Sequence, residues 1–485
     1  MKNIIPLCAL WLLSASLALH AEDLVEIYQL AESTNPQLKA SWAHYQAASA
    51  IQDQSTALLL PTIQMQVKAS KNGISSTLSN PSQAFGSSLT NTNDNFIQND
   101  LVLSLNQPIY HHDLFLKKQQ SLENLRHTSM LYQAEKQNLM IAVAKHYFSI
   151  LKSLDNLELS KIERQATQQQ LERTRKHYEA GELTATDVAE AQSRYDLVSA
   201  QLIAVENQLM IAQETLRELT GELHTEFQEL GKHMWLRPPE PDNIEHWMEM
   251  ALRKNMQLRA LQHTLIASKK NTQQQFSAHY PTVDLAFQWA KSSDDRKVSN
   301  PIPVSDDAPE DTQKLMELIG VNISGDALAS GTDNTTYSVG IQVNVPIYQG
   351  GMINAKYREA LHKENKLKNE LEQQRRKVSS LARKSYLGLI ASISQEKALK
   401  QAVISTKAAL EGIEVGLKLG SRTVIDVLTA QQEFYRAQRD HSRKRYDYLL
   451  NQLQLKQASG ELTFDDINNT NELLVEFIDI PKISL

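Results

Sequence analysis

Between His111 and Glu179 the chain contains neither proline nor glycine, although both occur elsewhere in its 485 residues. Apolar residues recur at helical spacing within this segment, at Leu139, Val143, Tyr147, Ile150, Leu154 and Leu157. A helix over about 111–180 would be roughly 100 Å long, which is more than a compact domain needs. The same reasoning predicts further long helices over about 183–230, 353–419 and 423–459.

One phrase, G-x-x-T-x-x-D-V-x-x-A-Q, occurs at Gly181 and again 239 residues later at Gly420. Further upstream, Asn35 and Pro61 match Asn255 and Pro281, an offset of 220 residues. We therefore interpret the chain as two homologous halves. Their expected bounds are 22–236 and 237–465, with a Pro-rich hinge at 237–241 and a C-terminal tail at 466–485.

Each half also contains alternating apolar and polar residues, which predict strands. A helix of about 30 residues is expected to end before Pro61, and another before Pro281, because proline disfavours helical geometry in the residue before it. The strands follow at about 61–71, 96–109, 281–291 and 335–348. A soluble sheet with one buried face and tilted membrane-spanning strands both fit this alternation. The long polar connections, Lys71–Asn95 and Ser292–Asn334, favour the membrane alternative.

The N-terminus is expected to direct export. Lys2 precedes an apolar run from Ile4 to Leu19, which predicts a signal peptide over residues 1–21. The single cysteine, Cys8, lies inside it, so we expect a mature chain without disulfides, thiol chemistry or a lipid anchor. No later segment is apolar for the roughly 18 residues that a membrane helix needs, so any spanning element must be a strand.

Charge and motifs exclude several classes of function. The net charge of -6 and pI of about 6.2 argue against binding of nucleic acid. The sequence predicts no enzyme, catalytic residue, cofactor or metal site. We interpret His111-His112-Asp113 as a helix start, since adjacent histidines point in different directions on a helix. We interpret the basic residues Arg439, Arg443, Lys444 and Arg445 as the solvated face of a coiled coil.

The repeated phrase predicts a tight reversal between two helices. Gly181 and Gly420 suit the left-handed residue that closes a helix, and Thr184 and Thr423 suit the N-cap of the next helix. Each threonine is followed three residues later by an aspartate, Asp187 or Asp426. Capping does not explain Arg422, which stands where the first half has Leu183. Glycines at 412, 416 and 420 indicate either a close helix contact or a weak helix.

The chain resembles the TolC-like outer membrane efflux proteins. The resemblance covers nearly the whole mature chain and includes P-I-Y-Q-G-G-M at Pro346, G-x-R-T-x-x-D-V-L at Gly420 and Y-x-Y-L-x-N-Q-L at Tyr446. It implies a mixed α and β membrane protein, a homotrimer in which four strands per chain form one twelve-stranded outer membrane β-barrel. A long α-helical barrel would continue it through the periplasm of a Gram-negative cell.

The resemblance also implies a function and partners. The trimer would be the exit duct of tripartite efflux or type I secretion systems. It would open at its periplasmic end when a periplasmic adaptor, or membrane fusion protein, and an inner membrane pump of the RND or ABC type dock. Two alternatives are a channel dedicated to drug or metal efflux and a soluble coiled-coil scaffold. The pump selects the cargo in such systems, so the sequence does not identify the substrate.

The resemblance also implies roles for residues of this chain that stand at the positions of the family's motifs. Arg422 looks like the arginine that links neighbouring hairpins, with Thr186 and Asp187 as its partners. Asp426 resembles the acidic residue of the narrowest ring. Leu417 stands where the family often has tyrosine and Thr429 where it often has a second aspartate. We therefore expect a weaker latch and weaker cation binding, with about three ring carboxylates per trimer. The adaptor-docking tips would be Gly181, Glu182, Leu183, Thr184, Gly420, Ser421, Arg422 and Thr423.

Overall fold

The computed structural model describes residues 23–78, 90–231, 234, 236–295, 297–298, 310–311, 314, 328–329 and 332–479. The expected signal peptide at 1–21 lies outside them, as do residues 79–89 and much of 299–331 in the expected polar connections. The chain forms two compact units. One comprises the described residues of Met1–Ser49, Glu123–Ile266 and Asn365–Leu485, and the other comprises Ala50–Leu122 and Ala267–Glu364. Each predicted half therefore contributes to both units.

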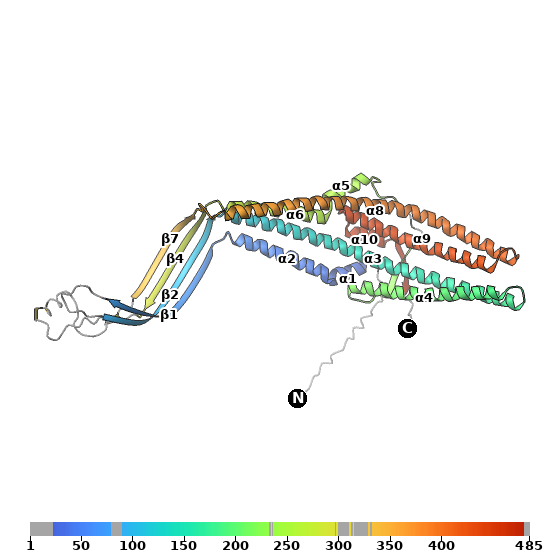
Figure 1. Cartoon of the computed structure of the whole chain (residues 1–485), viewed down its shortest axis with the longest axis horizontal. Helices are drawn as coiled ribbons and strands as arrows, with labels where there is room; N and C mark the ends of the chain where they lie inside the picture. Colours follow the sequence, from blue (N-terminus) through green and yellow to red (C-terminus); the bar gives the residue numbers. More distant parts are fainter. Residues whose placement is uncertain are drawn as a thin grey trace, which may run out of the picture. The chain divides into compact units, whose positions relative to one another are not determined.

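The second unit contains a four-stranded antiparallel sheet in the order β1-β2-β4-β7 (Figure 1). Its strands are β1 (Thr62–Leu78), β2 (Thr90–Tyr110), β4 (Thr282–Asp294) and β7 (Thr332–Asn344). Alternate residues of a strand lie on one face. The apolar face of β7 is exposed, with 69% of Val339 and 67% of Ile341 accessible to solvent.

The strands extend further into the expected polar connections than the sequence predicts. β1 continues to Leu78 and β2 begins at Thr90, and two short strands, β5 (Lys297–Val298) and β6 (Leu328–Ala329), pair inside the second connection. Backbone groups form the ladder, so polar side chains do not end it. Some side chains add to it, since Asn72 Nδ2 donates to Gln98 Oε1 across the strands at 3.0 Å.

Two long helical hairpins run through the chain (Figure 1). The first joins α3 (His112–Glu179) to α4 (Ala185–Thr220), and the second joins α8 (Met352–Lys418) to α9 (Val424–Ser459). Buried residues of α4 alternate at spacings of four and three: Val198, Leu202, Val205, Leu209, Ala212 and Leu216. This period of 3.5 residues is typical of a coiled coil. No helix in the described part of the chain is long and apolar enough to cross a membrane.

The helix predicted over 183–230 ends ten residues early. Gly221 adopts a left-handed conformation with φ of 86°, and its N–H donates to the Arg217 carbonyl at 2.7 Å. The following residues form β3 (Glu226–Leu230), which pairs with β8 (Leu474–Asp479). The tail also contains α10 (Phe464–Asn471). A strand whose partner lies almost 250 residues away has no local signal.

The two helices predicted to end before Pro61 and Pro281 are each divided in two. Asn35 separates α1 (Leu24–Thr34) from α2 (Pro36–Ala57), and Asn255 separates α5 (Ile244–Lys254) from α6 (Met256–Ser277). The Oδ1 of each asparagine accepts an N–H of the following helix, from Leu38 at 3.0 Å and from Leu258 at 3.1 Å. Each Nδ2 donates to a carbonyl near the end of a long helix, Leu219 or Ala458. The asparagines thus tie these breaks to α4 and α9.

Gly460 and Gly221 provide a test of this junction. Both have positive φ, but a Cβ on Gly460 would collide with the Lys254 carbonyl and lie 2.8 Å from the Asn255 nitrogen, whereas a Cβ on Gly221 would meet nothing within 4 Å. We expect Gly460→Ala to destabilise the fold by roughly 3 kcal/mol, and Gly221→Ala by only about 1 kcal/mol. Thermal unfolding followed by circular dichroism measures both. Equal losses would contradict the close contact at Gly460.

Candidate functional site

The turns that close the two hairpins have the same backbone geometry. Gly181 and Gly420 have φ of 80° and 71°. In the first turn, the N–H of Gly181 donates to Tyr178 and that of Glu182 to His177, both at 2.9 Å. The second turn repeats these bonds from Gly420 to Leu417 and from Ser421 to Gly416, at 3.0 and 2.9 Å. This arrangement is a Schellman motif, which confirms the predicted role of both glycines.

The next helices begin with the predicted capping boxes. Thr184 Oγ1 accepts the Asp187 N–H at 3.3 Å, and Asp187 Oδ2 accepts the Thr184 N–H at 2.9 Å. The corresponding distances are 3.2 and 2.9 Å for Thr423 and Asp426. Both predicted caps are therefore confirmed. Each aspartate places its negative charge at the positive end of a helix.

The electrostatic environment of Asp426 favours its charged form. The Thr423 backbone N–H and side-chain hydroxyl both donate to its carboxylate, and these hydrogen bonds hold the pKa of Asp426 below its ordinary value of 3.8. The nearby Arg422 charge lowers this pKa further. This carboxylate therefore carries its negative charge at neutral pH.

Arg422 is exposed and lies against its own turn. Its Cγ is 2.7 Å from the position that a Cβ on Gly416 would take, so the glycine leaves room for the arginine stem. Nothing in the described chain comes within 4 Å of the corresponding position on Gly412. Among the described residues, no hydrogen bond or ion pair joins Arg422 to Thr186 or Asp187. Both predicted partners are at least partly accessible.

A small apolar cluster joins the two hairpins near their tips. Its buried members come from three helices: Leu171 of α3, Ala191 of α4, and Val424 and Leu428 of α9. Leu183, Tyr195 and Leu417 pack against it. Leu417, the position where we expected a lost polar contact, therefore contributes apolar packing in this chain. Thr429, at the other departure from the family pattern, is exposed.

The first tip contains an interaction that the sequence did not predict. Glu182 Oε2 lies 2.5 Å from His177 Nδ1, across the turn that Gly181 closes. Both side chains are more than half exposed, so this pair contributes little to stability. It gives the first tip a charged surface, whereas Ser421 stands at the equivalent position of the second tip. The two tips therefore differ at Glu182 as well as at Leu183.

Around and behind the apolar cluster, between Ser160 and Thr174, most of the buried side chains of α3 are polar. The buried residues at spacings of three and four are Ser160, Glu163, Thr167, Gln170 and Thr174. Glu163, which is 5% exposed, binds Arg194 of α4 at 2.8 Å and Arg439 of α9 at 2.6 Å. The interpretation of Arg439 as a solvated residue is therefore wrong, and so is that of Arg445, which donates to the Gly231 carbonyl.

His111, just before α3, contacts a strand of the sheet. His111 Nε2 lies 3.1 Å from Asp284 of β4, and His112 begins α3. Over the residues that the structure describes, no group of three or more His, Cys, Asp or Glu could hold a metal ion. The polar residue Asp284 looked like one member of a strand alternation, so its pairing with His111 could not be predicted from spacing.

A protein family with this architecture matches both halves of the chain. The model for the outer membrane efflux protein family matches residues 27–222 and 247–461. The chain belongs to this family. It is therefore an outer membrane protein of Gram-negative type, and the function supported for it is that of an efflux or secretion channel. A soluble scaffold is not compatible with this membership.

Two relatives of this family member cover nearly its whole length. Outer membrane protein TolC of Vibrio cholerae is 30% identical, over 97% of this chain and 98% of that protein. The alkaline protease secretion protein AprF of Pseudomonas aeruginosa is 25% identical, over 94% of this chain and 89% of that protein. The names of these relatives denote outer membrane and secretion proteins, not enzymes.

Solved structures show the same fold. The CmeC outer membrane channel of Campylobacter jejuni matches with a TM-score of 0.72 at 14% identity, over 94% of this chain and 90% of that one. The outer membrane protein VceC of Vibrio cholerae matches with a TM-score of 0.70 at 16% identity, over 90% and 96% of the two chains. The arrangement of strands and long helices is therefore that of outer membrane channels.

The low pKa of Asp426 gives a testable pH dependence. Because the folded pKa is lowered, its stabilising effect is complete above the unfolded value and disappears as pH falls through the folded value. We expect protection of the first turn of α9 against hydrogen exchange to persist at pH 3.8, after correction for intrinsic rates, and to fall below it. Asp426→Asn, which cannot ionise, should remove this dependence. Loss of protection already above pH 3.8 would contradict the assignment.

Proposed function

We propose that this protein is the outer membrane exit duct of tripartite efflux or type I secretion systems, built as a homotrimer. The observation that carries the trimer is the sheet, in which β1 and β7 each pair on one side only among the described strands. Unpaired strand edges are not stable in lipid. Three copies joined edge to edge would give a closed barrel of about twelve strands, wide enough for a channel.

The two halves of the chain are repeats of one unit in this proposal. The two segments matched by the family model begin 220 residues apart and end 239 apart, the same offsets as those between the sequence motifs. The equivalent hydrogen bonds of Asn35 and Asn255 support the same relation. In the proposed trimer, first and second halves would alternate around the ring. The three chains would therefore form a ring of six similar units.

The long hairpins would extend the barrel through the periplasm and close it at their tips. In the closed state, Arg422 of one subunit would bind Thr186 and Asp187 of its neighbour. Asp426 would line the narrowest ring beside Thr429, so a ring of about three carboxylates would bind cations weakly. The exposure of Arg422 supports a partner outside its own chain.

Docking of a periplasmic adaptor and an inner membrane pump at the tips would open the duct. The tip residues Gly181, Glu182, Leu183, Thr184, Gly420, Ser421, Arg422 and Thr423 would make the contact. One curated relative is named for efflux and two for protease secretion, which supports a role in either kind of system. Neither the chain nor these names identify the cargo.

Single-channel conductance in planar bilayers tests the duct and the latch together. We expect stable pores of small conductance from the purified protein, and a conductance several-fold larger from an Arg422→Ser, Asp187→Ala double variant, because the links between tips are lost. Lys407→Ser, an exposed change on α8, the helix that leads into the Arg422 turn, is the control. Equal conductance in all three proteins would refute the latch, and folded protein without pores would refute the duct.

Substitutions at the tip glycines test docking. Neither Gly181 nor Gly420 has an atom within 4 Å of the position of an added Cβ, so a large side chain would project outward. We expect Gly181→Trp and Gly420→Trp to reduce export at least tenfold, while protein levels in the outer membrane remain normal. Alanine at the same positions introduces similar backbone strain without bulk and serves as the control. Normal export by both tryptophan variants would refute docking at the tips.

A further inference from the structure

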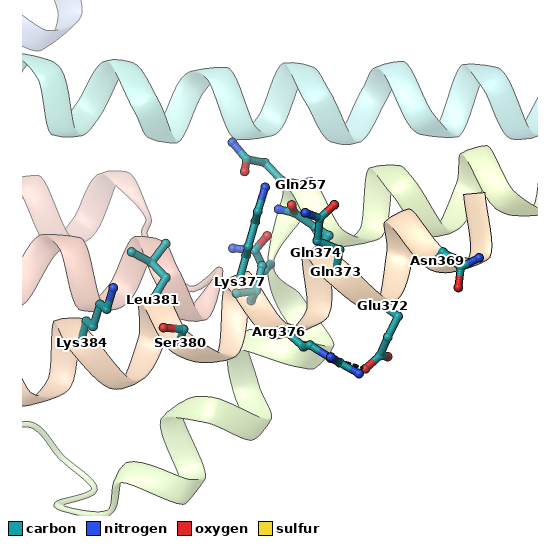
Figure 2. Close-up of a pocket in the computed structure, with 12 residues that line it drawn as sticks. Gln257, Asn369, Glu372, Gln373, Gln374, Arg376, Lys377, Ser380, Leu381 and Lys384 are labelled. Atoms are coloured by element: carbon teal, nitrogen blue, oxygen red, sulfur yellow. Dashed lines mark hydrogen bonds and ion pairs between the residues drawn. The ribbon is translucent and has the colours of Figure 1, made fainter. Parts of the chain in front are cut away.

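A polar groove lies along α8 in the helical unit and has a volume of about 970 Å³. Figure 2 shows Arg376, Lys377 and Lys384 of α8 together with Gln257 of α6 around it. Arg376 binds Glu372 of its own helix at 2.9 Å. Lys377 is exposed and forms no ion pair with another described residue. The groove therefore presents positive charge that this chain does not neutralise.

The repeat relates this groove to a contact that is filled within the chain. Residues of α3 correspond to residues of α8 at an offset of 239, as Lys145 and Tyr147 correspond to Lys384 and Tyr386. The same offset relates α4 to α9. On α3, Gln137 Nε2 donates to the Leu462 carbonyl at 3.0 Å, and Asn138 Oδ1 accepts from Gln457 Nε2 at 2.9 Å. The end of α9 therefore covers this part of α3.

The equivalents of these two contacting surfaces, on α8 and just after α4, are exposed to solvent. Leu462, just beyond α9, is 4% exposed, whereas its equivalent Leu223, just beyond α4, is 58% exposed. Phe148 of α3 is fully buried, whereas its equivalent on α8, Leu387, is 54% exposed. The end of α9 and the residues after it cover part of α3. The corresponding surfaces, the segment after α4 and part of α8, are both exposed.

We propose that the groove on α8 binds the C-terminal end of α4, with the residues just after it, from a second copy of this chain. The repeat replaces Gln137 and Asn138 by Arg376 and Lys377, and replaces Gln457 by Glu218. The Gln457–Asn138 hydrogen bond within a chain thereby becomes a Glu218–Lys377 ion pair between chains. Arg376 donates to the Leu223 carbonyl of the second copy. This inference rests on the proposed homotrimer and assigns one of its contacts.

Charge and geometry both favour this occupant. Glu218 is exposed on α4 and carries the charge opposite to that of Lys377. The contact joins two different surfaces, so it passes from each copy to the next and closes into a ring rather than a two-fold dimer. A pairing of charges across the contact would also fix which surfaces meet, because like charges oppose each other in other registers.

Cross-linking tests the contact directly. The only cysteine of the sequence is Cys8, in the expected signal peptide, so Cys8→Ala with Glu218→Cys and Lys377→Cys in one chain leaves a single defined pair of thiols. We expect a short bis-maleimide to produce covalent dimers and trimers from the double variant and not from either single variant. Glu218→Cys with Lys407→Cys is the control. The repeat relates Lys407 to Gln168 of α3, which is exposed, so we expect Lys407 to lie outside the contact.

Native mass spectrometry of the same samples separates the two proposals. A trimer that does not cross-link overturns the contact and leaves the duct intact, whereas a monomer overturns both. Charge reversal gives a second measurement. We expect Lys377→Glu or Glu218→Lys alone to increase the dissociation constant of the trimer by roughly tenfold, because each trimer loses three ion pairs. The double reversal should restore the trimer. Failure of the double reversal to restore the trimer would contradict the Glu218–Lys377 pairing.

Discussion

Backbone hydrogen bonding at the edges of the sheet is the constraint on which the rest of the molecule depends. A strand buried in lipid must pair on both sides, because no water is available to its free N–H and C=O groups. Among the described strands, the four-stranded sheet of one chain has two open edges, at β1 and β7. In the proposed trimer, the open edges of each sheet pair with those of the neighbouring copies.

The two hairpins show how much of such an assembly a single chain can specify. Schellman turns and capping boxes are complete within each hairpin, because all their donors and acceptors lie within a few residues. The apolar cluster of Leu171, Ala191, Val424 and Leu428 then holds the hairpins of one chain together. Arg422 takes no part in the hydrogen bonds of these turns and caps or in the apolar cluster. In the proposed ring, its partner is a second copy of the chain.

Sequence reasoning succeeded where the determining interactions are local. The predicted caps at Thr184 and Thr423 are present because the Thr and Asp of each cap are three residues apart. Predictions from the sequence failed where a residue or strand interacts with a partner that is distant in the sequence. The pairing of β3 with β8, the bonds from Asn35 and Asn255 to the ends of α4 and α9, and the contact of Arg439 with Glu163 all join segments far apart in the chain. The expected link from Arg422 requires another subunit, so neither the sequence nor one chain tests it.

The change from apolar to polar packing along α3 has a mechanical consequence. From Val143 to Leu157 the buried surface is apolar, so separating these helices would expose hydrocarbon to water at about 25 cal/mol per Å². From Ser160 to Thr174 all the buried side chains except that of Leu171 are polar, and they can form hydrogen bonds with water when they are uncovered. Apart from the small apolar cluster around Leu171, the half of α3 nearer the tip is therefore less costly to uncover than the half behind it. Such a gradient lets the ends of the helices move apart while their middle remains packed.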